Sequence, residues 1–190
     1  MNRQDMSWRS FGAPPVGRVG PSPTVAGARF GLAQIVLHWL VVLLVIEQYA
    51  TSGAMLRVHG YRPLGRPADP FDLTLHAVHA RVGLLIFGLV AVRLLLRIAW
   101  GAPEWLTPLP LWRRRLASGV QYALYVVLLG QALTGAIAIY LWWPMSAVHK
   151  TFFFALVVLL ALHLGGAALS FAARPGETLF RITALRLGRN

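Results

Sequence analysis

Four long apolar segments limit the fold of this chain more than any other feature. They run roughly over residues 30–52, 73–100, 116–143 and 147–173. Each exceeds the ~20 residues that a helix needs to cross a hydrocarbon core of ~30 Å. Helices are the expected form, because lipid cannot satisfy free backbone N–H and C=O groups. The sequence therefore predicts an all-α integral membrane protein, an up-down bundle of four helices.

The segments between and beyond the apolar runs predict the organisation of the chain. Proline-containing stretches at 53–72 and 101–115 are expected to be loops, and Trp142-Trp143-Pro144 predicts a tight turn in an interfacial aromatic belt. Residues 1–28 are rich in Gly, Pro, Ser and Arg, which is typical of a disordered tail. The expected division is a disordered cytoplasmic tail over 1–28, a four-helix domain over 29–175, and a short basic cytoplasmic tail over 176–190.

The distribution of the basic residues predicts the orientation in the membrane. Four spans place both termini on one side, and that side carries most of the basic residues. It has Arg3, Arg9, Arg18, Arg29, Arg93, Arg97, Arg113, Arg114, Arg115, Arg174, Arg181, Arg186 and Arg189, against Arg57, Arg62, Arg66, Arg81 and Lys150 on the other. The positive-inside rule then puts both termini in the cytoplasm. Because the charge of +12 is spread between apolar runs rather than over a polar surface, nucleic acid is not expected as a partner.

The chain contains no cysteine. This excludes disulfides, covalent c-type haem attachment and cysteine-ligated iron–sulfur clusters. Any redox cofactor must be held by other ligands, and histidine is the obvious candidate.

Four histidines are predicted to pair by depth within the spans. His163 follows His149 by fourteen residues, which is about 21 Å along a helix with the two side chains within about 40° of one face. Topology places His38 with His163 near the cytoplasmic side, and His79 with His149 near the outer side. Histidine inside a membrane helix usually marks a functional site, although a neutral histidine can also simply bond across a helix interface.

Two imidazoles on opposite sides of a porphyrin suit a six-coordinate electron-transfer haem. The predicted cofactors are therefore two haem b groups with bis-histidine ligation. Zinc is disfavoured, because it needs three or four ligands converging on one point. His76 lies three residues before His79 and is an alternative ligand; His79 is preferred because it is deeper and has Gly83 one turn beyond.

Other residues are candidates for contacts with these haems. Gly166 follows His163 as Gly83 follows His79, and both glycines equally suit close helix packing. Cationic partners for the propionates are Arg93 and Arg97 at the cytoplasmic level, and Arg81 and Lys150 at the outer level, although each could snorkel to the headgroups instead. Glu47 is interpreted as an interfacial residue, with proton handling for a quinone as the alternative.

Three stretches resemble the bacterial cytochrome b561 family, which is related to the cytochrome b subunits of nickel–iron hydrogenases and formate dehydrogenases. They are LAQIVLHWLVVLLVIEQY around His38, HAVHARVGLLIFGLVAVRLLLR around His79, and VHKTFFFALVVLLALHLGGAAL with His149 and His163. The resemblance covers about residues 30–175. It implies two haems b, one near each face of the bacterial inner membrane. One branch resembles a superoxide:quinone oxidoreductase, but that branch has another histidine where this chain has Ser170.

Three functions follow as hypotheses. The first is an oxidoreductase that passes electrons from an outer-face donor, superoxide or a redox protein, to membrane quinone. The second is a membrane-anchor subunit of a larger dehydrogenase or hydrogenase complex. The third is a haem-free transporter or scaffold. Membrane lipid is a partner in all three, and small-residue helix faces would allow a homodimer.

Overall fold

The computed structural model describes residues 31–61, 65, 67–101, 110–173 and 175, and these form four helices and no strand. The helices are α1 (Leu32–Tyr61), α2 (Pro70–Trp100), α3 (Leu111–Tyr140) and α4 (Met145–Ala173). Each is long and apolar enough to cross a membrane, which confirms the predicted all-α four-helix architecture. The predicted tails at 1–28 and 176–190 lie outside the described residues.

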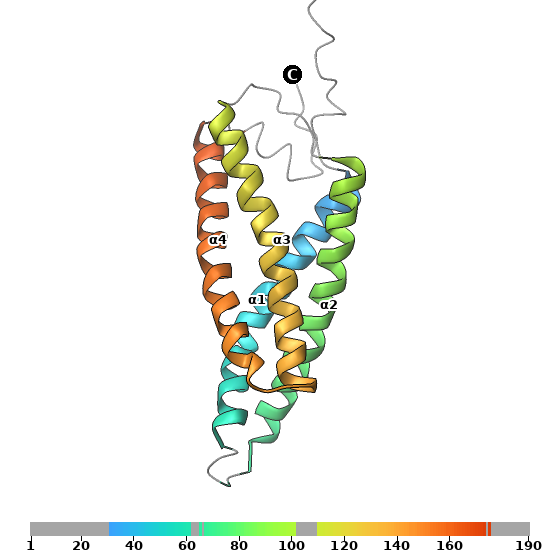
Figure 1. The fold of residues 1–190 in the computed structure, drawn as a ribbon, viewed down its shortest axis with the longest axis vertical. Helices are drawn as coiled ribbons and strands as arrows, with labels where there is room; N and C mark the ends of the chain where they lie inside the picture. Colours follow the sequence, from blue (N-terminus) through green and yellow to red (C-terminus); the bar gives the residue numbers. More distant parts are fainter. Residues whose placement is uncertain (1–30, 62–64, 66, 102–109, 174, 176–190) are drawn as a thin grey trace, which may run out of the picture.

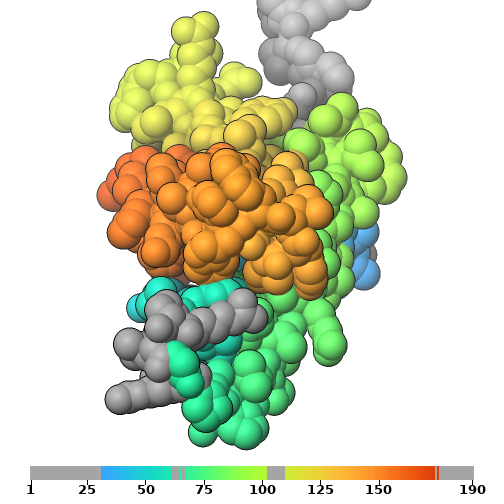
Figure 2. Space-filling view, turned by 60° about the horizontal axis from the view of Figure 1, so that its bottom comes forward, coloured from blue at the N-terminus to red at the C-terminus, as the bar shows by residue number. Residues whose placement is uncertain are grey.

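The helices pack in chain order, α1 on α2, α2 on α3 and α3 on α4. The lower end of the bundle in Figure 1 holds the end of α1, the start of α2 and the α3–α4 turn. The upper end holds the start of α1, the end of α2, the start of α3 and the end of α4. The α1–α2 hairpin projects beyond the α3–α4 turn at the lower end (Figures 1 and 2).

Two predicted helix boundaries were wrong. The predicted loop at 53–72 is shorter, because α1 continues to Tyr61. Its added turns contain no proline and bury Ala54 and Val58, so they retain both the backbone hydrogen bonds and a packing face. Consequently His59 lies in α1 rather than in a loop. The helix α3 begins at Leu111, directly after Pro110, and so includes the three arginines assigned to a connection.

Local signals explain the ends of α2. The Asp69 carboxylate accepts a hydrogen bond of 2.7 Å from the Phe71 backbone N–H, and Pro70 occupies the first turn. Gly101 ends the helix with φ 70°, a conformation that favours glycine. The predicted Trp142-Trp143-Pro144 turn connects α3 to α4, with the Trp142 N–H donating to the Ile137 carbonyl at 2.7 Å.

A buried apolar cluster lies in the middle of the bundle. Val41, Ile86 and Val90 form a buried cluster that is flanked by Tyr125 and Leu128 of α3, among others. Most other large apolar side chains are exposed along the helices, as expected for surfaces that face lipid. This apolar layer lies between two groups of polar side chains, one toward each end of the bundle.

Candidate functional site

His38 of α1 and His163 of α4 meet in the upper half of the bundle, and we call this pair the upper level. Their ring centroids are 6.3 Å apart. Among the described residues, neither ring takes part in a hydrogen bond. The structure thus brings together two histidines from different helices that the sequence had paired by depth alone.

The spacing of the upper level suits one metal ion between the two rings. An imidazole nitrogen lies about 2 Å from a bound metal, so rings on opposite sides of one iron have centroids roughly 6 Å apart. The two rings are oriented edge to face, with an angle of 71° between their planes. The observed 6.3 Å separation therefore accommodates an axial pair.

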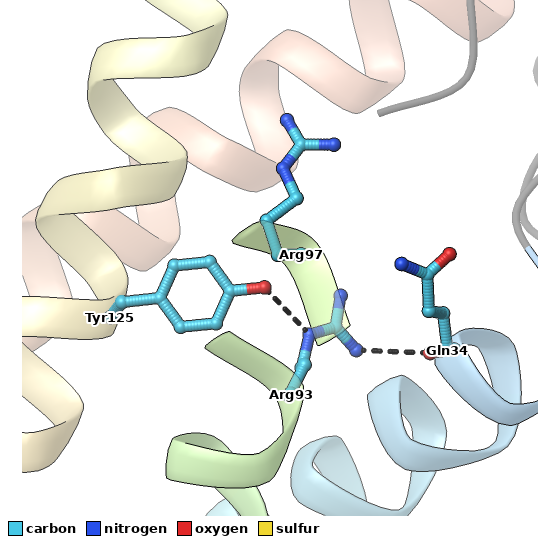
Figure 3. A pocket seen from close by; sticks show the side chains of 4 residues that line it. All are labelled: Gln34, Arg93, Arg97 and Tyr125. Carbon is cyan, nitrogen blue, oxygen red and sulfur yellow. Dashed lines mark hydrogen bonds between the residues drawn. The ribbon is translucent and has the colours of Figure 1, made fainter. Parts of the chain in front are cut away.

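Beside the upper level lies a small pocket lined by Gln34, Arg93, Arg97 and Tyr125 (Figure 3). Arg93 donates from Nε to the Tyr125 hydroxyl at 3.2 Å and from Nη1 to the Gln34 carbonyl at 3.3 Å. Arg97, one turn further along α2, donates from Nη2 to the Gln121 side chain at 3.1 Å. Its Nη1 is buried and has no hydrogen-bond partner in the part of the chain that the structure describes. The pocket therefore presents cationic donors to an acidic group.

His79 of α2 and His149 of α4 form the lower level, and each is half-buried. The two rings are close enough to interact electrostatically. His79 is bonded through Nδ1 to the Thr51 hydroxyl of α1 at 2.9 Å. Gln48, one turn earlier in α1, donates to the His79 backbone carbonyl at 3.0 Å.

The helix α3 contacts His149 in a matching way. His149 Nδ1 lies 2.9 Å from the Gln131 carbonyl and 3.4 Å from the Thr134 hydroxyl. The Gln131 side-chain nitrogen lies 3.2 Å from His149 Nε2. Both lower-level histidines are thus contacted by a glutamine and a threonine three residues apart on the preceding helix.

The sequence reasoning missed these four residues. Their signal is a short pattern, Gln-x-x-Thr, which occurs as QYAT at 48–51 and as QALT at 131–134. Polar residues three apart in an apolar span share one helix face and require partners there. The pattern covers only four residues in each helix, which is too short to stand out as a sequence repeat.

Glycines at the lower level permit close approach to side chains of α4. A Cβ atom at Gly135 would lie 2.9 Å from His149 Cε1, and one at Gly130 would overlap the Phe152 ring. Gly83 instead faces Gln48, at an ordinary 3.6 Å, and Gly166 has open space beside it. The proposed roles of Gly83 and Gly166 beside a cofactor stay predictions.

The alternative ligand His76 has a different environment. Its Nε2 lies 3.2 Å from His59 Nε2, and the His59 ring stacks on Trp143 with centroids 4.0 Å apart. This cluster lies at the lower end of α1 and α2, and it ties His76 to α1 rather than to His149. The arrangement favours His79 as the ligand at the lower level.

The remaining sequence candidates lie at the edges of this arrangement. Arg81 and Lys150 are exposed. Glu47 accepts a hydrogen bond of 3.0 Å from Gln48, a residue that contacts the lower level, and its interfacial position stays a prediction. Ser170 donates to the Gly166 carbonyl at 2.8 Å within its own helix.

The unpaired donor at the upper level fits a haem propionate. Within the described residues, three buried side-chain atoms lack a hydrogen-bond partner: Glu47 Oε1, Arg97 Nη1 and Gln131 Oε1. Of these, only Arg97 Nη1 is a donor, and a buried donor of this kind requires an acceptor, which the carboxylate of a propionate would supply. Among the described residues no three His, Cys, Asp or Glu side chains converge on one point, as a structural zinc site would need.

Comparison with known proteins identifies the family. Residues 29–184 match the model of prokaryotic cytochrome b561. The chain belongs to the prokaryotic cytochrome b561 family. This confirms the family assignment made from the histidine segments, and membership implies a transmembrane haem b electron-transfer protein.

A cytochrome b561 relative supports the same assignment. The chain is similar to cytochrome b561 homolog 1 of Escherichia coli (strain K12), with 29% identity over 107 residues. The match covers 56% of this chain and 57% of that protein, so the chain spans little more than half the length of this relative. No solved structure matches the chain at a significant level.

Replacing Gly130 by alanine is expected to destabilise this cytochrome b561. The new methyl group overlaps the Phe152 ring, and overpacking of this kind costs about 1–3 kcal/mol. Thermal unfolding of the detergent-solubilised protein measures the effect. Gly88→Ala is the matched control, because a Cβ there has no atom within 4 Å. Equal melting temperatures for the two variants would show that α3 and α4 are not in close contact at Gly130.

Proposed function

We propose that the chain holds two haem b groups, one at each level, and passes electrons between an outer-face donor and membrane quinone. The observation that supports this proposal is the grouping of four histidines from the apolar helices α1, α2 and α4 into two pairs at different depths. Each haem, when bound, takes up or releases one electron at its iron. His38 with His163 and His79 with His149 would be the axial ligands.

The surrounding side chains would hold and orient these groups. Arg93 and Arg97 would pair with propionates at the upper level, and Tyr125 and Gln121 keep the two guanidinium groups in place. At the lower level no cation is directed inward among the described residues, and exposed Arg81 is the cationic candidate. The apolar layer of Val41, Ile86 and Val90 keeps water out of the space between the levels.

The orientation is part of the proposal. The excess of arginine near both termini would place the upper end on the cytoplasmic side of a bacterial inner membrane. The lower end would then be on the outer side. The lower level is then the one nearer to an external donor. Arg57 makes a bidentate ion pair with Asp72, with contacts of 2.6 and 2.8 Å, which reduces its capacity to attract an anion such as superoxide.

One observation favours a second candidate, the membrane-anchor subunit. The α1–α2 hairpin projects beyond the α3–α4 turn and offers a surface at the lower end to which a redox protein can dock (Figure 2). The two candidates differ in what reduces the isolated protein. Reduction by superoxide alone supports the oxidoreductase, whereas reduction only with an added redox protein supports the anchor subunit.

Haem content tests the proposal directly. We expect two haems b per chain in a pyridine haemochrome assay of detergent-purified protein, with low-spin bis-histidine bands. His79→Ala should retain one haem, and His76→Ala should retain both, because His76 bonds to His59 rather than facing the lower level. A single haem in the His76 variant would show that His76, and not His79, is the lower-level ligand. No haem in the wild-type protein, after expression with ample haem, would favour the transporter or scaffold.

A further inference from the structure

The hydrogen bonds of the lower level define which nitrogen of each histidine is available to a metal. The Gln131 carbonyl can only accept, so His149 Nδ1 must carry a proton and donate to it. The Thr51 hydroxyl donates its own proton to the backbone carbonyls of Glu47 or Gln48, and so accepts from His79 Nδ1. Both rings are therefore Nδ1–H tautomers whose Nε2 atoms carry the lone pair that can bind a metal. In this structure the Nε2 atom of His149 accepts from the Gln131 side-chain amide, which would have to turn away when a metal binds.

Such hydrogen bonds also change how well an imidazole donates electrons. A histidine ligand that donates its second N–H to an oxygen becomes more basic. A more basic axial ligand stabilises ferric iron relative to ferrous iron, which lowers the reduction potential. The Glu47 carboxylate accepts a hydrogen bond from Gln48 and lies within electrostatic range of His79, so it acts in the same direction.

The upper level has the opposite character. The rings of His38 and His163 have no hydrogen bond among the described residues. The guanidinium of Arg93 lies within electrostatic range of both rings, and Arg97 is one turn away. Arginine is always charged in proteins. A fixed positive charge favours the reduced state of a nearby iron, because reduction removes one positive charge from it.

We propose that Thr51 and Gln131 act as positioning residues that give the lower level a lower reduction potential than the upper level, which Arg93 flanks. The proposal rests on the proposed function, since it requires a haem at each level. With such potentials, an electron delivered at the lower end would be held preferentially at the upper level.

Spectroelectrochemical titration of the holoprotein tests the order of the two potentials. We expect two resolved midpoint potentials in the wild type. His149→Ala, which removes the lower-level pair, should retain only the more positive one, and His163→Ala should retain only the more negative one. The reverse order would overturn the proposal. Two haems with the wrong order would contradict this inference alone, whereas fewer than two haems in the wild type would contradict the proposed function.

Two further variants test the cause with haem ligation intact. Thr51→Val keeps the volume but removes the hydroxyl that accepts from His79, so the midpoint potential of the lower-level haem should become more positive. Arg93→Gln should make the midpoint potential of the upper-level haem more negative. The matched controls are Thr151→Val, an exposed threonine near His149 that bonds only within α4, and Arg114→Gln, an exposed arginine at the upper end. Shifts in the controls as large as in the test variants would show that the named contacts do not set the potentials.

Discussion

Replacing His163 by alanine is expected to leave one haem per chain and to abolish electron transfer across the membrane. The change removes one axial ligand of the upper level, while the lower level, about 21 Å away along α4, keeps both of its own. The remaining haem then has no second haem between it and the far face. Haem content falls by half, and the rate at which an enclosed acceptor is reduced by an external donor in proteoliposomes falls to the background of empty vesicles.

A second variant, His38→Ala, tests whether the two upper-level histidines bind the same haem. His38→Ala removes the other upper-level ligand and should reproduce the His163 variant in haem content and spectrum. The two together should be no worse than either one, because both remove the same haem. A double variant without any haem would show that His38 and His163 belong to different haems, and the pairing by depth would be wrong.

Replacing Gly135 by valine should empty the lower level without altering any ligand. Even a single Cβ at this position lies 2.9 Å from His149 Cε1 and 3.1 Å from its Nδ1, and a branched side chain extends further. The imidazole is displaced from its hydrogen bond to the Gln131 carbonyl and from the line toward His79. We expect one haem per chain, with the spectrum of the His149→Ala variant.

Gly88→Val serves as the control for this substitution, because a Cβ at Gly88 has no neighbour within 4 Å. It also adds a β-branched residue to an apolar span, and so reproduces the effect on helix propensity. The control should retain two haems. Loss of haem from both variants, or from neither, would contradict a specific contact between Gly135 and His149.

Much of the architecture could be predicted from the sequence because the bilayer restricts the chain so strongly. A span has to be helical and about 20 residues long, so the number of helices and their order up and down follow from hydropathy. The depth of a histidine then follows from counting residues at 1.5 Å each. His38 and His163 were paired in this way, and the structure brings their rings together from α1 and α4, with centroids 6.3 Å apart.

The ends of the helices were less predictable. Apolar runs show where lipid begins, but a helix continues as long as its backbone and one face are satisfied. The last turns of α1 extend beyond the apolar run because Ala54 and Val58 pack in the bundle and Arg57 bonds to Asp72 of α2. These contacts join residues on different helices, and no pattern within α1 alone predicts them.

The apolar length of the spans and the depths of the four histidines were thus determined by the sequence itself, through the thickness of the bilayer and the helical rise. Only the tertiary structure decided which polar side chains face which histidine. The rotation of each helix about its axis depends on packing against its neighbours, because lipid and interior are equally apolar and the hydropathy pattern marks no face. That rotation brings Thr51 to His79 and Gln131 to His149, and it leaves Arg93 beside the other pair.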